Sequence, residues 1–227
     1  MVQEKIQPVE TLLLKKPLLR GWFHAIAAVG AVIVTIALCW MSQSDFPRMI
    51  SMLIFGMSMI ELYTVSAIYH IGNWPAPQRS VLRTIDHANI FILIAGTYTP
   101  LCFNILSGWF RIAILLLIWL LAVLGVCLSF FTLKIPRRVL AGLYVGMGWV
   151  ALLAIPSFIT KLPWTALATL ALGGVLYTIG AVIYARKRPD PFPRVFGYHE
   201  IFHIFVIAGS VAFTACIWIW AVPFPRI

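Results

Sequence analysis

Runs of apolar residues, each long enough to cross a lipid bilayer, dominate the chain. A membrane-spanning helix needs about 20 predominantly apolar residues, because the hydrocarbon core is about 30 Å thick and a helix rises about 1.5 Å per residue. Seven such runs predict seven spans, at residues 19–41, 49–71, 84–106, 109–132, 138–159, 164–185 and 198–222. The connections are short, so we predict one all-α, seven-helix membrane domain over residues 19–222, with short tails at 1–18 and 223–227.

The composition agrees with a lipid environment. The 227 residues are 62% hydrophobic and only 11% charged, whereas soluble domains are about 25% charged. The first residues carry mixed charge and no small-residue cleavage pattern, so we expect no cleaved signal peptide. The four cysteines lie within or at the ends of spans and lack C-x-x-C spacing, so we assign them no metal or redox chemistry.

The distribution of basic residues predicts the orientation. Thirteen of the 17 lysines and arginines precede the first span or lie in the loops between spans two and three, four and five, and six and seven. Lysine and arginine are enriched in the cytoplasmic loops of membrane proteins (the positive-inside rule). This distribution therefore places the N-terminus in the cytoplasm and the C-terminus on the outer side of the cell membrane. The net charge of +10 does not indicate nucleic-acid binding, because the charges lie in short loops that flank the spans.

The last span opens on the pattern H-E-x-x-H, formed by His199, Glu200 and His203. In soluble zinc hydrolases this pattern puts two imidazoles on one helix face, with the glutamate as general base. Ionisable side chains at membrane depth are costly, so such a cluster is a candidate functional site. Polar residues of other spans at the same depth would complete such a site.

His70, near the cytoplasmic end of the second span, is the expected third imidazole. Three neutral imidazoles from two helices match a tetrahedral zinc site that keeps one position open. The sequence thus predicts Zn²⁺ bound by His70, His199 and His203 on the cytoplasmic side. The alternative is a polar cluster that only holds helices together.

Three further side chains are candidate catalytic residues. Asp86, which we expect in the first turn of the third span, could act as general base or orient a histidine. Ser66, one turn before His70, could donate to a substrate carbonyl or to the metal-bound water. Glu200 could be the base, as in soluble enzymes, or could instead cap the last span or pair with a loop arginine. We expect His87 to face away from Asp86 and to lie at the membrane interface.

These residues also carry a family resemblance. The segments are Ser66-Ala67-Ile68-Tyr69-His70, Ile85-Asp86-His87 followed by Ile94-Ala95-Gly96-Thr97-Tyr98-Thr99-Pro100, and Tyr198-His199-Glu200-Ile201-Phe202-His203. In order and position they resemble the three signature blocks of the hemolysin III family, part of a larger group with alkaline ceramidases and progestin and adipoQ receptors. The resemblance implies a seven-helix bundle with the N-terminus inside, zinc on the three histidines, and the family's serine and aspartate at Ser66 and Asp86.

Two function classes follow from this resemblance and the predicted site. Ceramidase and receptor relatives suggest a zinc-dependent intramembrane hydrolase acting on a lipid-like amide or ester. The alternative is a non-enzymatic cytolysin-like factor or sensor with a structural zinc. The short N-terminal tail lacks the long cytoplasmic domain of the receptor branch, which argues against a hormone receptor. An open coordination position and a cavity from the bilayer to the metal would favour the enzyme.

Overall fold

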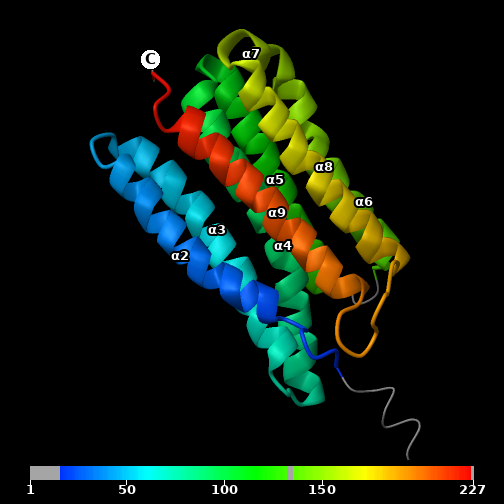
Figure 1. Cartoon of the computed structure of the whole chain (residues 1–227). Coiled ribbons are helices and arrows are strands. Elements are labelled where there is room, and N and C mark those ends of the chain that lie inside the picture. The colour runs from blue at the N-terminus through cyan, green and yellow to red at the C-terminus, as the bar shows by residue number, and fades with distance from the viewer. Residues whose placement is uncertain (1–15, 132–134, 226–227) are drawn as a thin grey trace, which may run out of the picture.

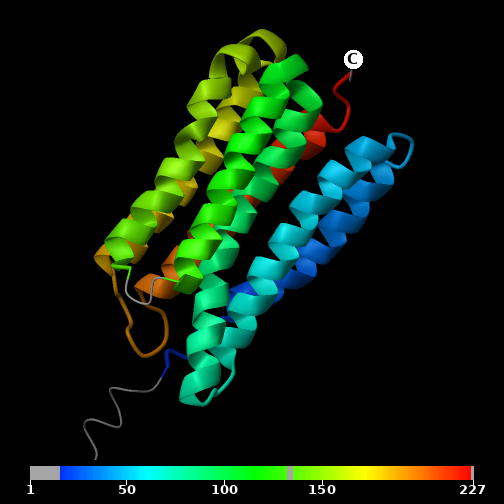
Figure 2. The ribbon, with the colours of Figure 1, turned by 180° about the vertical axis from the view of Figure 1, so that it is seen from behind.

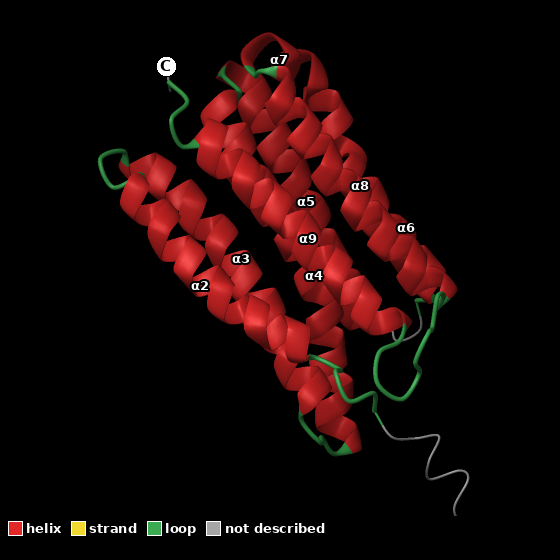
Figure 3. Ribbon diagram, in the orientation of Figure 1, coloured by secondary structure: helices red, strands yellow, loops and turns green. Residues whose placement is uncertain are grey.

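A computed structural model describes residues 16–131 and 135–225. Its helices are α2 (Trp22–Met41), α3 (Phe46–Ile71), α4 (Ala76–Ile105), α5 (Gly108–Phe131), α6 (Arg137–Trp149), the 3₁₀ turn η1 (Val150–Ala154), α7 (Ile155–Lys161), α8 (Trp164–Arg186), α9 (Tyr198–Cys216) and the π-helical turn η2 (Ile217–Ala221). Seven helical spans are long and apolar enough to cross a membrane, with α6, η1 and α7 forming one and α9 and η2 another. The predicted all-α, seven-span fold is confirmed (Figure 3).

The largest differences from prediction are at the start of α4 and inside the fifth span. The helix α4 begins at Ala76, well before the predicted start at Thr84. Its first turns are polar and follow Pro75, so a search for apolar runs misses them although proline favours a helix start. Within the fifth span, the α-helical hydrogen bonding gives way to a 3₁₀ turn before Pro156, whose ring nitrogen has no hydrogen to donate.

Parts of the predicted tails and one predicted span end lie outside the described residues. These are residues 1–15, residues 132–134 and residues 226–227.

The helix α4 forms the centre of the bundle. Most of its apolar stretch is buried, whereas at most half of each other span is buried. The helices α2 and α3 pack against each other along one side of the molecule, and α8 packs against α9 (Figure 1). The reverse view shows α5 against α4 (Figure 2). Large apolar side chains cover the outer surface, for example Ile33, Ile36 and Leu120, as a helix in contact with lipid requires.

The two ends of the bundle differ in charge. The first described residues, the α3–α4 connection and the α8–α9 connection lie at one end, and the C-terminal end of the chain lies at the other (Figure 1). The end that holds the first described residues is called the basic end below. Its described cations are Lys16, Arg20, Arg79, Arg83, Arg137, Arg138, Arg186, Lys187, Arg188 and Arg194. The opposite end holds Arg48, Arg111 and Lys161 among the described residues.

Arg48 fastens the C-terminal segment at that opposite end. Its guanidinium donates to the carbonyl oxygen of Val222 and, at 2.6 Å, to that of Phe224. The segment after η2 is therefore held against the start of α3.

Candidate metal centre

Three buried histidines converge at the basic end. His70 lies in the last turn of α3, and His199 and His203 lie in the first two turns of α9. One ring nitrogen from each lies within 4.8 Å of those of the other two, and the Nε2 atoms of His70 and His199 are 3.0 Å apart. Imidazole nitrogens at this spacing are a suitable donor set for Zn²⁺, which takes three protein ligands in its catalytic sites.

The first turn of α9 is fixed by hydrogen bonds at its N-terminus. The Oε2 atom of Glu200 accepts the backbone N–H of Gly197 at 2.8 Å, and the Oδ1 atom of Asp190 accepts that of Tyr198 at 2.9 Å. These bonds satisfy two of the amide groups that a helix start leaves without partners. Because His199 and His203 are one turn apart, fixing this turn also fixes their common face.

Glu200 both caps α9 and pairs with an arginine, the two alternatives to a catalytic role. Besides capping α9, its Oε1 atom forms an ion pair with the guanidinium of Arg20, and the side chain is fully buried. One oxygen therefore belongs to the cap and the other to the ion pair.

Asp86 and Ser66 lie beside the histidines. The Oδ2 atom of Asp86 is 3.9 Å from the Nε2 atom of His70, and the hydroxyl of Ser66 interacts with the same carboxyl group. Since α4 begins at Ala76, Asp86 lies about three turns into the helix rather than in its first turn. Both residues are buried, so the structure brings together two of the three predicted catalytic side chains and all three predicted ligands.

His87 lies closer to Asp86 than expected. Its Nδ1 atom is 2.7 Å from the carbonyl oxygen of Arg83, one turn back, and 3.6 Å from Oδ2 of Asp86. A carbonyl oxygen only accepts, so Nδ1 carries the proton and Nε2 accepts the hydroxyl of Tyr184 at 2.9 Å. The ring folds back over its own helix and joins α4 to α8.

His24 is a neighbour of the site that the sequence did not indicate. Its ring lies parallel to that of His203, with centroids 3.8 Å apart and planes inclined by 10°. It is 2% exposed, and neither ring nitrogen has a hydrogen-bond partner among the described residues. The available signal was its position at the start of a span, at the same end as the other histidines.

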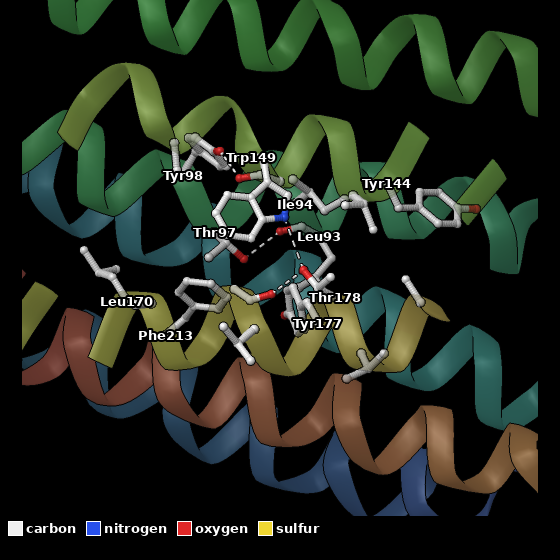
Figure 4. A pocket seen from close by; sticks show the side chains of 18 of the residues that line it. Leu93, Ile94, Thr97, Tyr98, Tyr144, Trp149, Leu170, Tyr177, Thr178 and Phe213 are labelled. Carbon is white, nitrogen blue, oxygen red and sulfur yellow. Dashed lines mark hydrogen bonds between the residues drawn. The ribbon is translucent and has the colours of Figure 1, made fainter. Parts of the chain in front are cut away.

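A cavity of about 430 Å³ leads away from the site through the bundle. At the basic end it is bounded by His24, Ser66, Asp86 and His203, and it continues between α4, α6, α8 and α9 toward Trp164. Figure 4 shows its middle part, where Tyr98, Trp149 and Tyr177 surround the space. Most other lining side chains are apolar, among them Leu93, Leu101, Phe158, Leu170 and Val206.

The cavity also reaches the outer surface of the bundle. The lining residues Leu152, Ile159 and Trp164 are each more than half exposed. The indole of Trp149 on α6 donates to the hydroxyl of Thr178 on α8 at 3.2 Å across the same wall (Figure 4). In a bilayer this wall would face lipid.

The comparisons with known proteins agree over nearly the whole chain. Residues 12–214 match the model of the family described as "Haemolysin-III related". The chain is 34% identical to Hemolysin-3 homolog of Bacillus subtilis (strain 168) over 176 residues, which cover 78% of this chain and 79% of the relative. It is 27% identical to Hemolysin-3 of Bacillus cereus over 94% of this chain and 95% of the relative. Monocyte to macrophage differentiation factor of Homo sapiens is 28% identical over 86% of this chain and 80% of the relative. The resemblance found in the signature segments is thereby confirmed, and the chain is a multi-pass membrane protein of the haemolysin III family.

Proposed function

We propose that this protein is a zinc-dependent intramembrane hydrolase that cleaves a lipid-like amide or ester near the cytoplasmic side of the cell membrane. The observation that carries the proposal is that a long, mostly apolar cavity ends on Asp86, Ser66 and a histidine of the three-histidine cluster. A lipid chain fits such a cavity, and the polar end is where its carbonyl group would lie.

The ligands in this proposal are His70, His199 and His203. Bound by these three imidazoles, Zn²⁺ would supply polarisation of a substrate carbonyl and would lower the pKa of water to about 7. Neutral imidazoles do not offset the charge of the ion, so the nearby carboxylate of Asp86 would do so in part.

Asp86 is the general base in this mechanism. Its carboxylate is close to His70 but outside the group of atoms that all lie within 4.8 Å of one another, so in the proposal it stands beside the ligands. There it would accept a proton from the attacking water and return it to the leaving nitrogen or oxygen of the substrate. The hydroxyl of Ser66 lies at Asp86, and in the proposal its single proton would turn from that carboxylate to the oxygen of the substrate carbonyl as negative charge develops there. Glu200 is assigned to positioning, because its two oxygens are held by Gly197 and Arg20.

The substrate enters from the bilayer in this account. The exposed lining residues Leu152, Ile159 and Trp164 lie where the cavity meets the lipid-facing surface. An acyl chain that enters there replaces lipid contacts with apolar protein contacts, so little free energy is lost on entry.

A second candidate function is a cytolysin-like factor or a sensor in which zinc is structural. It is motivated by the name of the Bacillus cereus relative, Hemolysin-3. It needs no cleavage reaction, so it predicts zinc binding without release of a product.

A lipid panel separates these two functions. Purified protein is incubated with ceramides, other lipid amides and lipid esters, and released fatty acid is measured. The hydrolase account expects release by the wild type and none by Asp86→Asn. Glu61→Gln, which changes an exposed carboxylate on α3, is the matched control and should retain activity. Zinc-loaded wild-type protein that releases nothing from any member of the panel would favour the second function.

A further inference from the structure

The segment from Lys16 to His24, called the strap below, contacts both halves of the histidine cluster. One half is His70 on α3, and the other is His199 and His203 on α9. Among the described residues, α3 and α9 meet mainly through side chains, such as Tyr63 and Ser210, whereas the backbone of α2 packs closely against both helices. The start of α2 is therefore placed to hold the two halves at ligating distance.

The strap is tied to the chain beside each half. The backbone N–H groups of Leu18 and Leu19 donate to the carbonyl oxygens of Arg194 and Val195, at 3.1 and 3.2 Å, just before α9. On the other side, the ammonium group of Lys16 donates to the carbonyl oxygen of Gly72, which follows α3.

Gly21 is the point of closest approach to His70. Its φ is +87°, a conformation that favours glycine. A Cβ atom built there would lie 2.8 Å from Cβ of His70 and 3.0 Å from Cγ1 of Ile71. Any larger residue must push the strap away from the last turn of α3.

Arg20 and His24 contact the other half. Arg20 pairs with Glu200, which lies in the α9 turn that carries His199 and His203. His24 stacks on His203 and has the ring of Tyr63 near it, with centroids 5.0 Å apart. The parallel faces of the two imidazole rings are the contact through which His24 holds His203 in place.

We propose that the strap is the clamp that sets the separation of His70 from His199 and His203, and that His24 is a positioning residue whose ring fixes the orientation of His203. The proposal rests on the proposed zinc site. It adds the start of α2 to a centre otherwise formed by α3, α4 and α9.

The experiment measures zinc affinity of the purified full chain by competition with a chromophoric chelator. Gly21→Ala is compared with Gly30→Ala, which lies on α2 with no atom within 4 Å of the added Cβ. His24→Ala is compared with His24→Phe, which keeps a flat ring against His203. We expect Gly21→Ala and His24→Ala to bind zinc about 10–100-fold more weakly, the range found for residues that orient ligands. Gly30→Ala and His24→Phe should stay close to the wild type.

Two further readouts separate positioning from general stability. The visible spectrum of the Co²⁺-substituted protein reports ligand geometry, and we expect it to change in His24→Ala but not in Gly30→Ala. The melting temperature of the metal-free protein should fall only a little in these variants, so that lower stability does not explain their weaker zinc binding. If Gly21→Ala does not fold, Arg20→Gln takes its place, because it removes the contact to Glu200 without adding volume.

Several outcomes would overturn the clamp. Equal zinc affinities of Gly21→Ala and Gly30→Ala would do so. Equal losses of zinc affinity in His24→Phe and His24→Ala would also do so, since the ring nitrogens of His24 rather than its stacked ring would then matter. Wild-type protein that binds zinc but cleaves no lipid would contradict the proposed hydrolase and leave the clamp intact. Wild-type protein that binds no zinc would contradict both.

Discussion

The carboxyl group of Asp86 lies 3.9 Å from the ring nitrogen of His70, a contact between α4 and the last turn of α3. The atoms that all lie within 4.8 Å of one another belong to the three histidines and not to Asp86, so we assign this carboxylate a place beside the ligands. Asp86→Asn should therefore abolish proton transfer while leaving the three nitrogens in place. We expect a loss of about 10²–10⁴-fold in lipid cleavage with zinc content unchanged, measured by fatty-acid release and metal analysis on the same preparation. Loss of zinc together with activity would instead make Asp86 part of the ligand set.

The cavity makes a prediction about chain length. Gly174 lines it, and no atom lies within 4 Å of a Cβ added there. Gly174→Phe should fill the middle of the cavity and reduce cleavage of long-chain substrates much more than that of short-chain ones. The matched control is Gly142→Phe, at an exposed position of α6 that does not line the cavity. Identical chain-length profiles for the two variants would mean that the substrate chain does not occupy this space.

A buried chain of hydroxyl groups should contribute to stability. Ser210 on α9 accepts the hydroxyl of Tyr63 on α3 at 2.6 Å and bonds that of Tyr177 on α8 at 2.7 Å. Ser210→Ala leaves two buried phenols short of a partner, and we expect a loss of about 1–2 kcal/mol in the free energy of unfolding in detergent. Ser129→Ala removes a hydroxyl that donates within its own helix to the carbonyl oxygen of Gly125, and it should have a smaller effect. The reverse order of the two effects would contradict the role assigned to this chain.

The basic end is predicted to face the cytoplasm. Single cysteines placed at Lys187 and at Arg111, in a chain without its own cysteines, test this with a thiol reagent that does not cross membranes. In intact cells the reagent should label Arg111→Cys and not Lys187→Cys. The opposite pattern would place the histidine cluster on the outer side.

The fold could be predicted largely because a lipid environment permits few backbone structures. Backbone groups must be bonded within each segment, so long apolar runs become helices, and all seven were found. The start of α4 was missed because its first turns are polar, although Pro75 marks it. The break at η1 was missed because an apolar run does not distinguish an α-helix from a 3₁₀ turn.

The site was predictable where local spacing carries the information. His199 and His203 share a face by their one-turn separation, and the depth of His70 and Asp86 follows from the direction of their spans. The contact of His24 with His203 joins the start of the first span to the last span, and no local pattern encodes it. The cavity depends on how α6 and α8 pack against α4, which is likewise a property of the assembled bundle.

The central claim is that zinc at this centre drives cleavage of a lipid amide or ester, and its most direct test is removal and return of the metal. Fatty-acid release by the wild type is measured before chelation, after it, and after addition of Zn²⁺, with His203→Ala in parallel. The account predicts about one zinc per chain, activity lost on chelation and restored by Zn²⁺, and neither zinc nor activity in His203→Ala. Activity that survives complete removal of zinc, or full zinc content in His203→Ala, would contradict it.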